Sequence, residues 1–313
     1  MWHQLTLKAA YTYSKTTDNT SEIFATGAAG NTNAFAQSQV NFTGQEHGLS
    51  GINFPHNFSL SVTEEIPFLR SQQGVLGHIL GGWSASAVYF LASGQPYTAS
   101  QGALNCSSGG GACSPTDFNG NLTPYDFAFN GAFVGADGAL RPFAGSNSAP
   151  VGSVGIFTGD WFGCDGTAGN PCPTGLTPTT LLSLNALNTT GKNVVVTNKD
   201  VRFITNGFFA DQAFGTPFGN VSRNTLSDAK TNIVNFTFFK TIKVKEHFKV
   251  QWHMTMLDAF NHPNFFSVDS FIDDAGLTQQ GTGFANPSLT NGGIGAAVGI
   301  PGRSIRFGIK LFW

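Results

Sequence analysis

Charged residues are scarce in this chain, which has 16 Lys and Arg and 18 Asp and Glu among its 313 residues. The formal net charge of −2 offers no basic surface of the kind that binds nucleic acid. Long apolar runs are also missing, because no window approaches the roughly 18 apolar residues that a membrane-spanning helix requires. The mean hydropathy is nevertheless close to neutral, at −0.03. A membrane role is therefore open only to strands, whose hydrophobicity is diluted by every second residue.

Motifs for catalysis are absent as well. The chain contains no Gly-x-Ser-x-Gly elbow, and its glycine runs at 109–111 and 292–293 lack the Lys-Ser/Thr that completes a phosphate-binding loop. The carboxylates of Asp273 and Asp274 have neither the spacing of a calcium loop nor that of a glycosidase pair. We therefore expect no enzyme activity, no metal site and no cofactor.

Phenylalanine and glycine are plentiful, with 30 Phe and 39 Gly, and many lie in segments where apolar and polar side chains alternate. Successive side chains of a strand point to opposite faces, so such a segment has one apolar and one polar surface. At the end of the chain Arg306 and Lys310 lie opposite five apolar residues: Ile305, Phe307, Ile309, Leu311 and Trp313. We expect these five to face lipid and to form the signal that the barrel-assembly machinery reads in the last strand. A soluble sandwich strand has the same period, and Phe312 interrupts the alternation.

Six segments with this alternation are predicted to be strands: 2–14, 56–65, 81–97, 232–244, 247–256 and 302–313. Each is about as long as the ~9–11 residues that a tilted strand needs to cross a bilayer. Long and short connections alternate, which is typical of outer-membrane barrels with long extracellular loops and short periplasmic turns. The predicted fold is therefore all-β, an antiparallel transmembrane β-barrel segment with its C-terminus on the periplasmic side.

The longest connection, 98–229, is rich in Gly, Ser, Asn and Pro and is predicted to be an extracellular loop insertion with room for hairpins of its own. All four cysteines lie in it, as the pairs Cys106 with Cys113 and Cys164 with Cys172. Their even number and local spacing favour two disulfides in an oxidising compartment. Unpaired thiols and a zinc site are the alternatives, although the spacing is wider than that of the usual zinc pair.

Aromatic residues of the same loop are candidates for ligand contact. Rings at the extracellular mouth can stack on a ligand, and the candidates are Trp161, Phe162, Phe208 and Phe209. The alternative is a structural role in packing. On the polar face of one strand, His247 and His253 are candidates to bind an anionic or metal-chelate ligand, and the favoured alternative is that they are ordinary polar residues of the lumen. About 20 Å of strand separates them, which is too far for the two rings to share an ion.

Six strands are too few to close a barrel, because the smallest single-chain barrels have about eight and an open sheet would leave unpaired edges in lipid. The start of the chain also shows no signal peptide, since Met1 leads directly into the first strand pattern. We therefore expect residues 1–313 to be the C-terminal part of a larger barrel, with the missing strands upstream.

Several phrases along the chain resemble the late barrel of Oar-like TonB-dependent receptors. They are YTYSK at 11–15, PHNFSLS at 55–61, LGGW at 80–83, SGQPYT at 93–98, GNVSRN at 219–224, DAFNHPNF at 258–265 and RSIRFGIK at 303–310. Their order along the chain is more specific than any single phrase. The resemblance covers both ends of the chain and skips the middle, 101–199.

Membership of that family implies a barrel of about 22 strands, closed by an N-terminal plug domain and energised through TonB. Such receptors import siderophores, saccharides or peptides across the outer membrane of Gram-negative bacteria. The resemblance thus implies that this chain lies in outer-membrane lipid and contributes to nutrient capture and uptake, and that TonB is engaged only through the missing plug domain.

Two other functions remain open from the sequence. A structural or adhesive outer-membrane barrel would present the disulfide-closed loop at the surface without transporting anything. A soluble all-β binding protein is disfavoured by the apolar face of the last strand.

Overall fold

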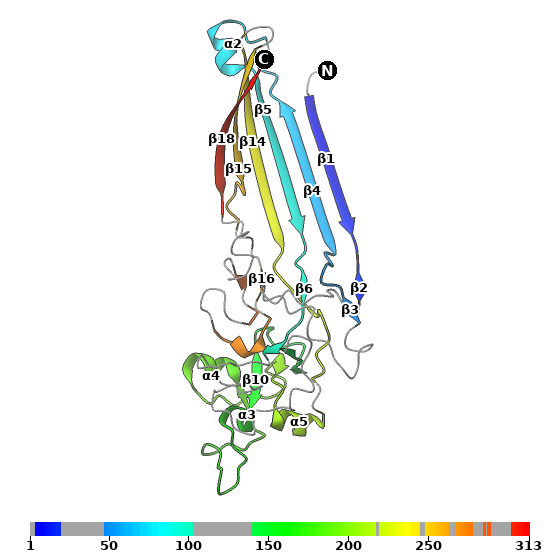
Figure 1. Ribbon diagram of the computed structural model, residues 1–313, viewed down its shortest axis with the longest axis vertical. Helices are drawn as coiled ribbons and strands as arrows, with labels where there is room; N and C mark the ends of the chain where they lie inside the picture. Colours follow the sequence, from blue (N-terminus) through cyan, green and yellow to red (C-terminus); the bar gives the residue numbers. More distant parts are fainter. Residues whose placement is uncertain are drawn as a thin grey trace.

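The computed structural model describes residues 4–19, 47–69, 71–102, 139–216, 219–244, 248–262, 264, 267–268, 270–277, 284–285, 287–288 and 302–313. Six long strands form one antiparallel sheet in sequential order (Figure 1). They are β1 (Gln4–Tyr13), β4 (His56–Glu65), β5 (Trp83–Ala92), β14 (Thr231–Lys243), β15 (Lys249–Leu257) and β18 (Ser304–Phe312). Within the described residues, β1 and β18 are the two edges of this sheet.

The pairing register sorts the side chains by polarity. Residues paired across antiparallel strands point to the same face of a sheet. One row of paired residues crosses all six strands with apolar side chains: Leu7, Val62, Ala87, Phe236, Met256 and Ile305. The neighbouring row, on the opposite face, is polar throughout: Thr6, Thr63, Ser86, Thr237, Thr255 and Arg306. The sheet therefore has one apolar face and one polar face.

The apolar face is open to the surroundings of the chain. Leu7 is 62 % exposed, and Phe307 and Ile309 of β18 are each 67 % exposed. The other residues predicted to face lipid, Ile305, Leu311 and Trp313, are exposed as well. Contiguous apolar surfaces of this size are rare on soluble monomers. Such a face fits the hydrocarbon of a bilayer.

The structure contains all six predicted long strands, but the predicted strand 81–97 is too long at both ends. β5 covers only Trp83–Ala92. Beyond it the chain leaves the sheet, and Pro96, which has no N–H to donate to a ladder, begins the short strand β6 (Pro96–Tyr97). β6 pairs with β13 (Leu226–Ser227) instead of continuing along β14.

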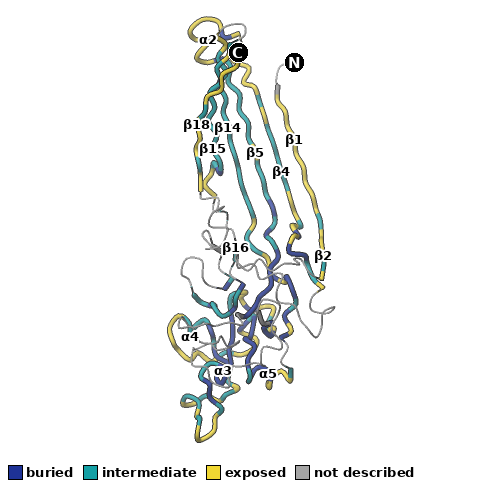
Figure 2. Tube along the Cα trace, viewed as in Figure 1, coloured by how far each residue is buried: buried dark blue, intermediate teal, exposed yellow. Residues whose placement is uncertain are grey.

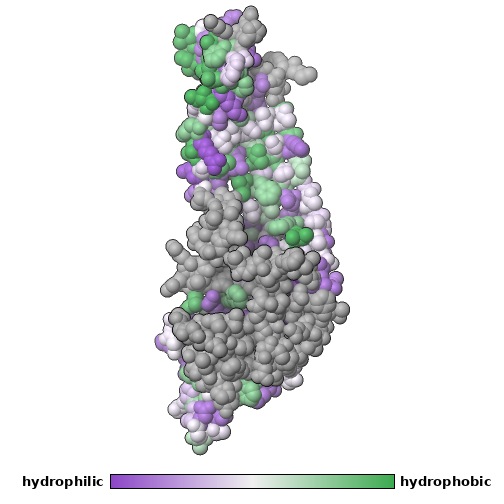
Figure 3. Space-filling model, in the orientation of Figure 1, coloured by the Kyte–Doolittle hydropathy of each residue, from purple (hydrophilic) through white to green (hydrophobic). Residues whose placement is uncertain are grey.

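The connection between β4 and β5 contains a helix that the sequence analysis did not predict, α2 (Gly74–Leu80). Four of its residues are apolar with the spacing of one helix face: Val75, Leu76, Ile79 and Leu80. α2 lies at the end of the sheet where the C-terminus is found (Figure 1), and hydrophobic residues gather there (Figure 3). None of the helices in the described ranges is long and apolar enough to span a bilayer.

A folded unit, here termed the loop domain, occupies the opposite end of the sheet (Figure 1) and comprises residues 139–216, 219–228 and 270–277. Its sheet has the order β11 (Leu181–Ser183), β10 (Val154–Phe157), β12 (Phe203–Ile204) and β9 (Phe143–Ala144). Its helices are α3 (Thr158–Phe162), α4 (Leu184–Thr190) and α5 (Phe208–Phe214). The predicted insertion 98–229 is thus more than an irregular loop, because it carries a sheet and helices.

Burial is concentrated in the loop domain, whereas the long strands are half-buried or exposed except at Ala92 and Lys240 (Figure 2). One core cluster contains the fully buried Val154, Ile156 and Leu182, and a second contains Phe143 and Ile204. Ile272 joins the first cluster from the 3₁₀ helix η3 (Ile272–Asp274) in the last connection. The connections β5–β14 and β15–β18 therefore fold together into one unit.

Three further short hairpin ladders complete the described structure. β2 (Thr17–Asp18) pairs with β3 (Gly48–Leu49), β7 (Gln101–Gly102) with β8 (Ala139–Leu140), and β16 (Ser267–Val268) with β17 (Pro287–Ser288). These strands have only two residues each, which is too short for an alternation of apolar and polar residues to be recognised in the sequence.

Arginine substitutions test which face contacts lipid. Phe307→Arg, on the apolar face, is expected to cost about 2–4 kcal/mol if the residue lies near the bilayer midplane. Thr237→Arg, in the polar row, is the matched control and is expected to be tolerated. The measurement is the urea midpoint of the protein in its membrane, followed by heat-modifiable mobility on gels. Equal losses for both variants would contradict the assignment of faces.

Candidate functional site

The polar face of the sheet is the first candidate for ligand contact. Five cationic residues project from it: Lys8, Lys243, Lys249, Arg306 and Lys310. Glu65 is the one carboxylate on this face within the six described strands. A wall with an excess of one charge raises the local concentration of solutes of opposite charge. The polar face is therefore suited to anionic solutes.

His253 lies on this polar face, as predicted, beside the ring of Phe239 at 6.3 Å between centroids. It pairs with Gly308 of β18, and a Cβ added to Gly308 would collide with the His253 ring. The glycine therefore leaves room for the imidazole to lie across the neighbouring strand. The other predicted histidine, His247, lies outside the described residues.

A disulfide joins Cys164 and Cys172 in the loop that follows α3. Hydrogen bonds brace this loop internally, because Asn170 Nδ2 donates to the Gly163 carbonyl at 2.8 Å and Thr167 Oγ1 donates to the Asp165 carboxylate at 2.7 Å. In the part of the chain that the structure describes, no group of three or more His, Cys, Asp or Glu side chains is placed to hold a metal. Cys106 and Cys113 lie outside the described residues.

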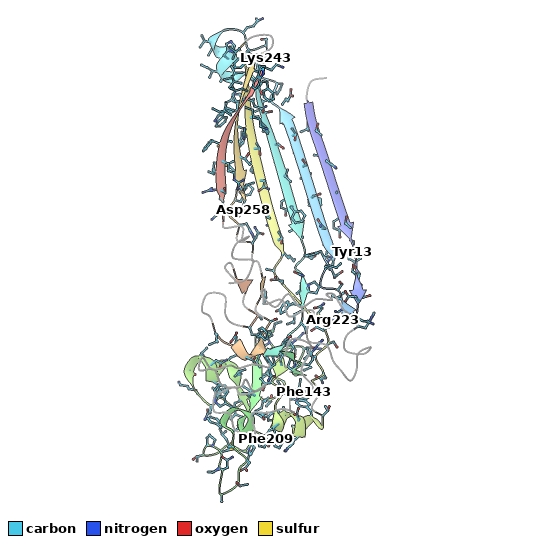
Figure 4. All side chains as sticks on the ribbon, viewed as in Figure 1. Tyr13, Phe143, Phe209, Arg223, Lys243 and Asp258 are labelled. Atoms are coloured by element: carbon cyan, nitrogen blue, oxygen red, sulfur yellow. A yellow bond between two sulfur atoms is a disulfide. The ribbon has the colours of Figure 1, made fainter. Side chains whose placement is uncertain are left out.

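The four aromatic residues predicted as ligand contacts lie in the loop domain, where they take part in packing. Phe209 is 6 % exposed and belongs to the second core cluster, so its ring is not open to a ligand from solvent. Phe208 packs against the same cluster while half-buried. Trp161 and Phe162 are half-buried against the first cluster. Figure 4 shows Phe143 and Phe209 within this domain.

Two buried carboxylates meet where α3 contacts α5. Asp160, a residue of α3, caps the N-terminus of α5. Its carboxylate accepts hydrogen bonds from the backbone N–H groups of Phe209 at 2.8 Å and Ala210 at 3.2 Å. Asp211 is 5 % exposed, and neither of its side-chain oxygens has a hydrogen-bond partner among the described residues. Burial, and then the negative charge of Asp160, raise the pKa of Asp211 to about 8. Asp211 is therefore mostly protonated at neutral pH.

This raised pKa predicts how the stability of the loop domain depends on pH. The folded state binds the Asp211 proton more tightly than the unfolded state, so stability falls as pH rises from about 4 to about 8 and is flat above. The loss is at most about 1.4 kcal/mol per pH unit. Asp211→Asn is expected to abolish this slope in urea titrations of the loop domain monitored by proteolysis.

The exposed Asp200 provides the matched control for this experiment. Hydrogen bonds from Thr197 lower the pKa of Asp200, so Asp200→Asn is expected to leave the slope between pH 5 and 8 unchanged. A slope that persists in Asp211→Asn would show that another group causes it.

A buried polar network ties the loop domain to the ends of the long strands. The Arg223 guanidinium, which is 2 % exposed, forms an ion pair with Asp18 beyond β1 and donates to the Asp18 carbonyl at 2.8 Å. Asn224 donates to the Leu49 carbonyl at 2.6 Å, and its backbone N–H donates to Thr98 Oγ1 at 2.9 Å. Figure 4 places Arg223 at this junction. The sequence analysis did not identify this pairing, because Asp18 and Arg223 are 205 residues apart.

Removing the guanidinium is expected to loosen this junction. Arg223→Met should cost about 1–3 kcal/mol, the range for hydrogen bonds to a charged group and for leaving a buried partner unsatisfied. The predicted readout is faster protease cleavage between the loop domain and the sheet, with heat-modifiable mobility unchanged. Lys199→Met, at an exposed position, is the control. Equal cleavage rates in the two variants would refute a role for Arg223 in holding the junction.

Two of the phrases that suggested a known family lie in connections and make hydrogen bonds to neighbouring segments. GNVSRN, at 219–224, contains the junction residues Arg223 and Asn224. DAFNHPNF begins at Asp258 after β15, where the Asp258 N–H donates to the Asn235 side chain of β14 at 2.9 Å. Asn264 of the same phrase accepts from the Asn232 N–H at 2.6 Å. These residues fasten loops to neighbouring strands.

The apolar face, the polar face and the alternating connections of the six-stranded sheet are those of an outer-membrane β-barrel wall. A family model described as "outer membrane beta barrel domain" matches residues 1–162 and 151–293, so the chain belongs to this family of outer-membrane β-barrel domains. It is therefore a protein of the outer membrane of Gram-negative bacteria. No curated protein and no solved structure matches the chain.

Proposed function

We propose that the chain forms the C-terminal barrel segment of a TonB-dependent outer-membrane transporter and contributes to the capture and uptake of a nutrient. The observation that carries the proposal is the excess of cations on the polar face of a sheet whose opposite face is apolar. The folded loop domain at one end of the same sheet adds to it. The ordered phrases at the strand ends support it. Such walls guide a solute without reacting with it, so the proposed role is transport without enzymatic chemistry.

Siderophores, saccharides and peptides are the candidate substrates. The positive charges of Arg306, Lys310 and their neighbours favour an anionic member of these classes. The proposal also includes three partners: membrane lipid, the barrel-assembly machinery acting on β18, and TonB acting through a plug domain.

A structural or adhesive barrel is the second candidate function. The observation that favours it is the loop domain, which has two core clusters and the braced Cys164–Cys172 loop. A rigid surface module of this kind is suited to contact with another surface.

Uptake and adhesion can be measured in the same strains. Deletion of the gene is expected to abolish uptake of one labelled nutrient and to leave adhesion to surfaces unchanged. An uncoupler is expected to abolish the same uptake in the undeleted strain, because the proposed transport is energised through TonB. Replacing both Arg306 and Lys310 by Glu is expected to lower uptake of an anionic nutrient at least several-fold, because the wall would then repel it. Lys199→Glu on the loop domain is the control. Lost adhesion with normal uptake would favour the second candidate.

A further inference from the structure

The connection between β4 and β5, described at residues 66–69 and 71–82, is built against the apolar face of the sheet and is here termed the α2 turn. Lys240 of β14 projects from this face, because it pairs with Trp83 and Trp252. Its Nζ donates to the Ile79 carbonyl at 3.0 Å and to the Gly81 carbonyl, and lies 5.2 Å from the centre of the Trp83 ring. The C-terminal end of α2 therefore lies over the apolar face and not over the lumen.

The α2 turn is held to the sheet by a side chain whose amide group makes the hydrogen bonds that a neighbouring strand would make. The amide of Gln72 donates from Nε2 to the Thr241 carbonyl at 2.7 Å and accepts from the Lys243 N–H at 3.1 Å. It thus takes the place of a further β5 residue beside β14. Residue 82 has to be glycine, because its φ is +73° and a Cβ there would collide with the Gln72 side chain and the Thr241 carbonyl. This fixed attachment gives the turn a defined outer surface.

That outer surface is strongly apolar. Val75 is 76 % exposed, Leu76 69 % and Phe68 65 %, and other exposed apolar residues of the turn are Ile66, Leu69, Ile79 and Leu80. His78 is the one ionisable side chain that the structure describes between 66 and 82. The surface continues directly from the lipid-facing side of β5 and β14, through the contacts of Trp83 and Lys240 with Ile79.

We propose that the α2 turn is a membrane anchor, which lies among the phospholipid acyl chains of the leaflet nearest the C-terminus. The outer surface of the α2 turn is continuous with the lipid-facing side of the sheet, and this continuity identifies lipid as the partner of the turn. A protein bound to the turn would have to displace lipid from the turn and from the adjoining strands. Interfacial helices bury their apolar face about 5–10 Å into a leaflet. The charge of Lys240 is compatible with this position in the membrane, because two carbonyl groups of the turn and an indole ring contact its ammonium group in place of lipid.

Photocrosslinking of the whole chain in outer membranes tests the anchor. A benzophenone amino acid at Leu76 is expected to form an adduct with phospholipid, detected as a lipid mass on the corresponding peptide. The same probe at Phe307 is the positive control, and at Val195, which is 57 % exposed on the loop domain, the negative control. If the Leu76 variant does not show the heat-modifiable mobility of the folded protein, Val75 carries the probe instead.

Each outcome at the probe position decides the proposal. Lipid adducts at Leu76 comparable to those at Phe307, and several-fold above Val195, support it. Adducts with a second copy of the chain or with another protein would show that the turn is a protein interface. No adduct above the Val195 level would show that it lies in water. Either of these last two results overturns the anchor.

Lys240 can be tested separately from the lipid contact. Lys240→Met keeps an apolar chain of similar length but removes the donors to the Ile79 and Gly81 carbonyls. The lipid adduct at Leu76 is expected to fall several-fold, because the turn is then less firmly held, whereas the adduct at Phe307 stays unchanged. An unchanged yield at Leu76 would overturn the role assigned to Lys240.

Discussion

The register of the six-stranded sheet is the constraint on which the rest of the structure depends. Side chains alternate with a period of two, so a slip by one residue would exchange the two faces of a strand. In β18 such a slip would move Arg306 and Lys310 to the lipid side and Phe307 to the lumen. The continuous apolar row from Leu7 to Ile305 shows that every strand is in the register that prevents this. The sequential antiparallel order of the strands, in turn, puts the β4–β5 connection with α2 at one end of the sheet and the β5–β14 connection with the loop domain at the other.

Charges at the two ends of the sheet are stabilised by different means. Lys240, on the apolar face, is surrounded by backbone carbonyls and an indole ring. Arg223, buried at the junction, is paired with Asp18. Asp211, inside the loop domain, has no such partner among the described residues and instead retains its proton, because burial and Asp160 raise its pKa. Ionised groups away from water thus receive a partner or are neutralised.

The sequence was sufficient to predict the long strands and which of their residues share a face, because the alternation extends over most of a strand of nine or more residues, as in β18. It was insufficient for the loop domain, whose strands of two to four residues carry no period and whose core joins Ile156 to Ile272 from another connection. α2 had a readable apolar spacing, yet a helix of seven residues is easily taken for part of a turn. The pairings of Arg223 with Asp18 and Gln72 with β14 depend on tertiary contacts that no local pattern reports.

The most direct test of the account is a nitroxide accessibility scan along β14 in the membrane. Spin labels at Val234, Phe236 and Phe238 are expected to be relaxed by oxygen dissolved in lipid, and labels at Asn235 and Thr237 by a water-soluble nickel reagent. This alternation with a period of two is the result that the account predicts. Accessibility to the aqueous reagent at every position, or an alternation of opposite phase, would contradict the assignment of one wall to lipid and the other to the lumen.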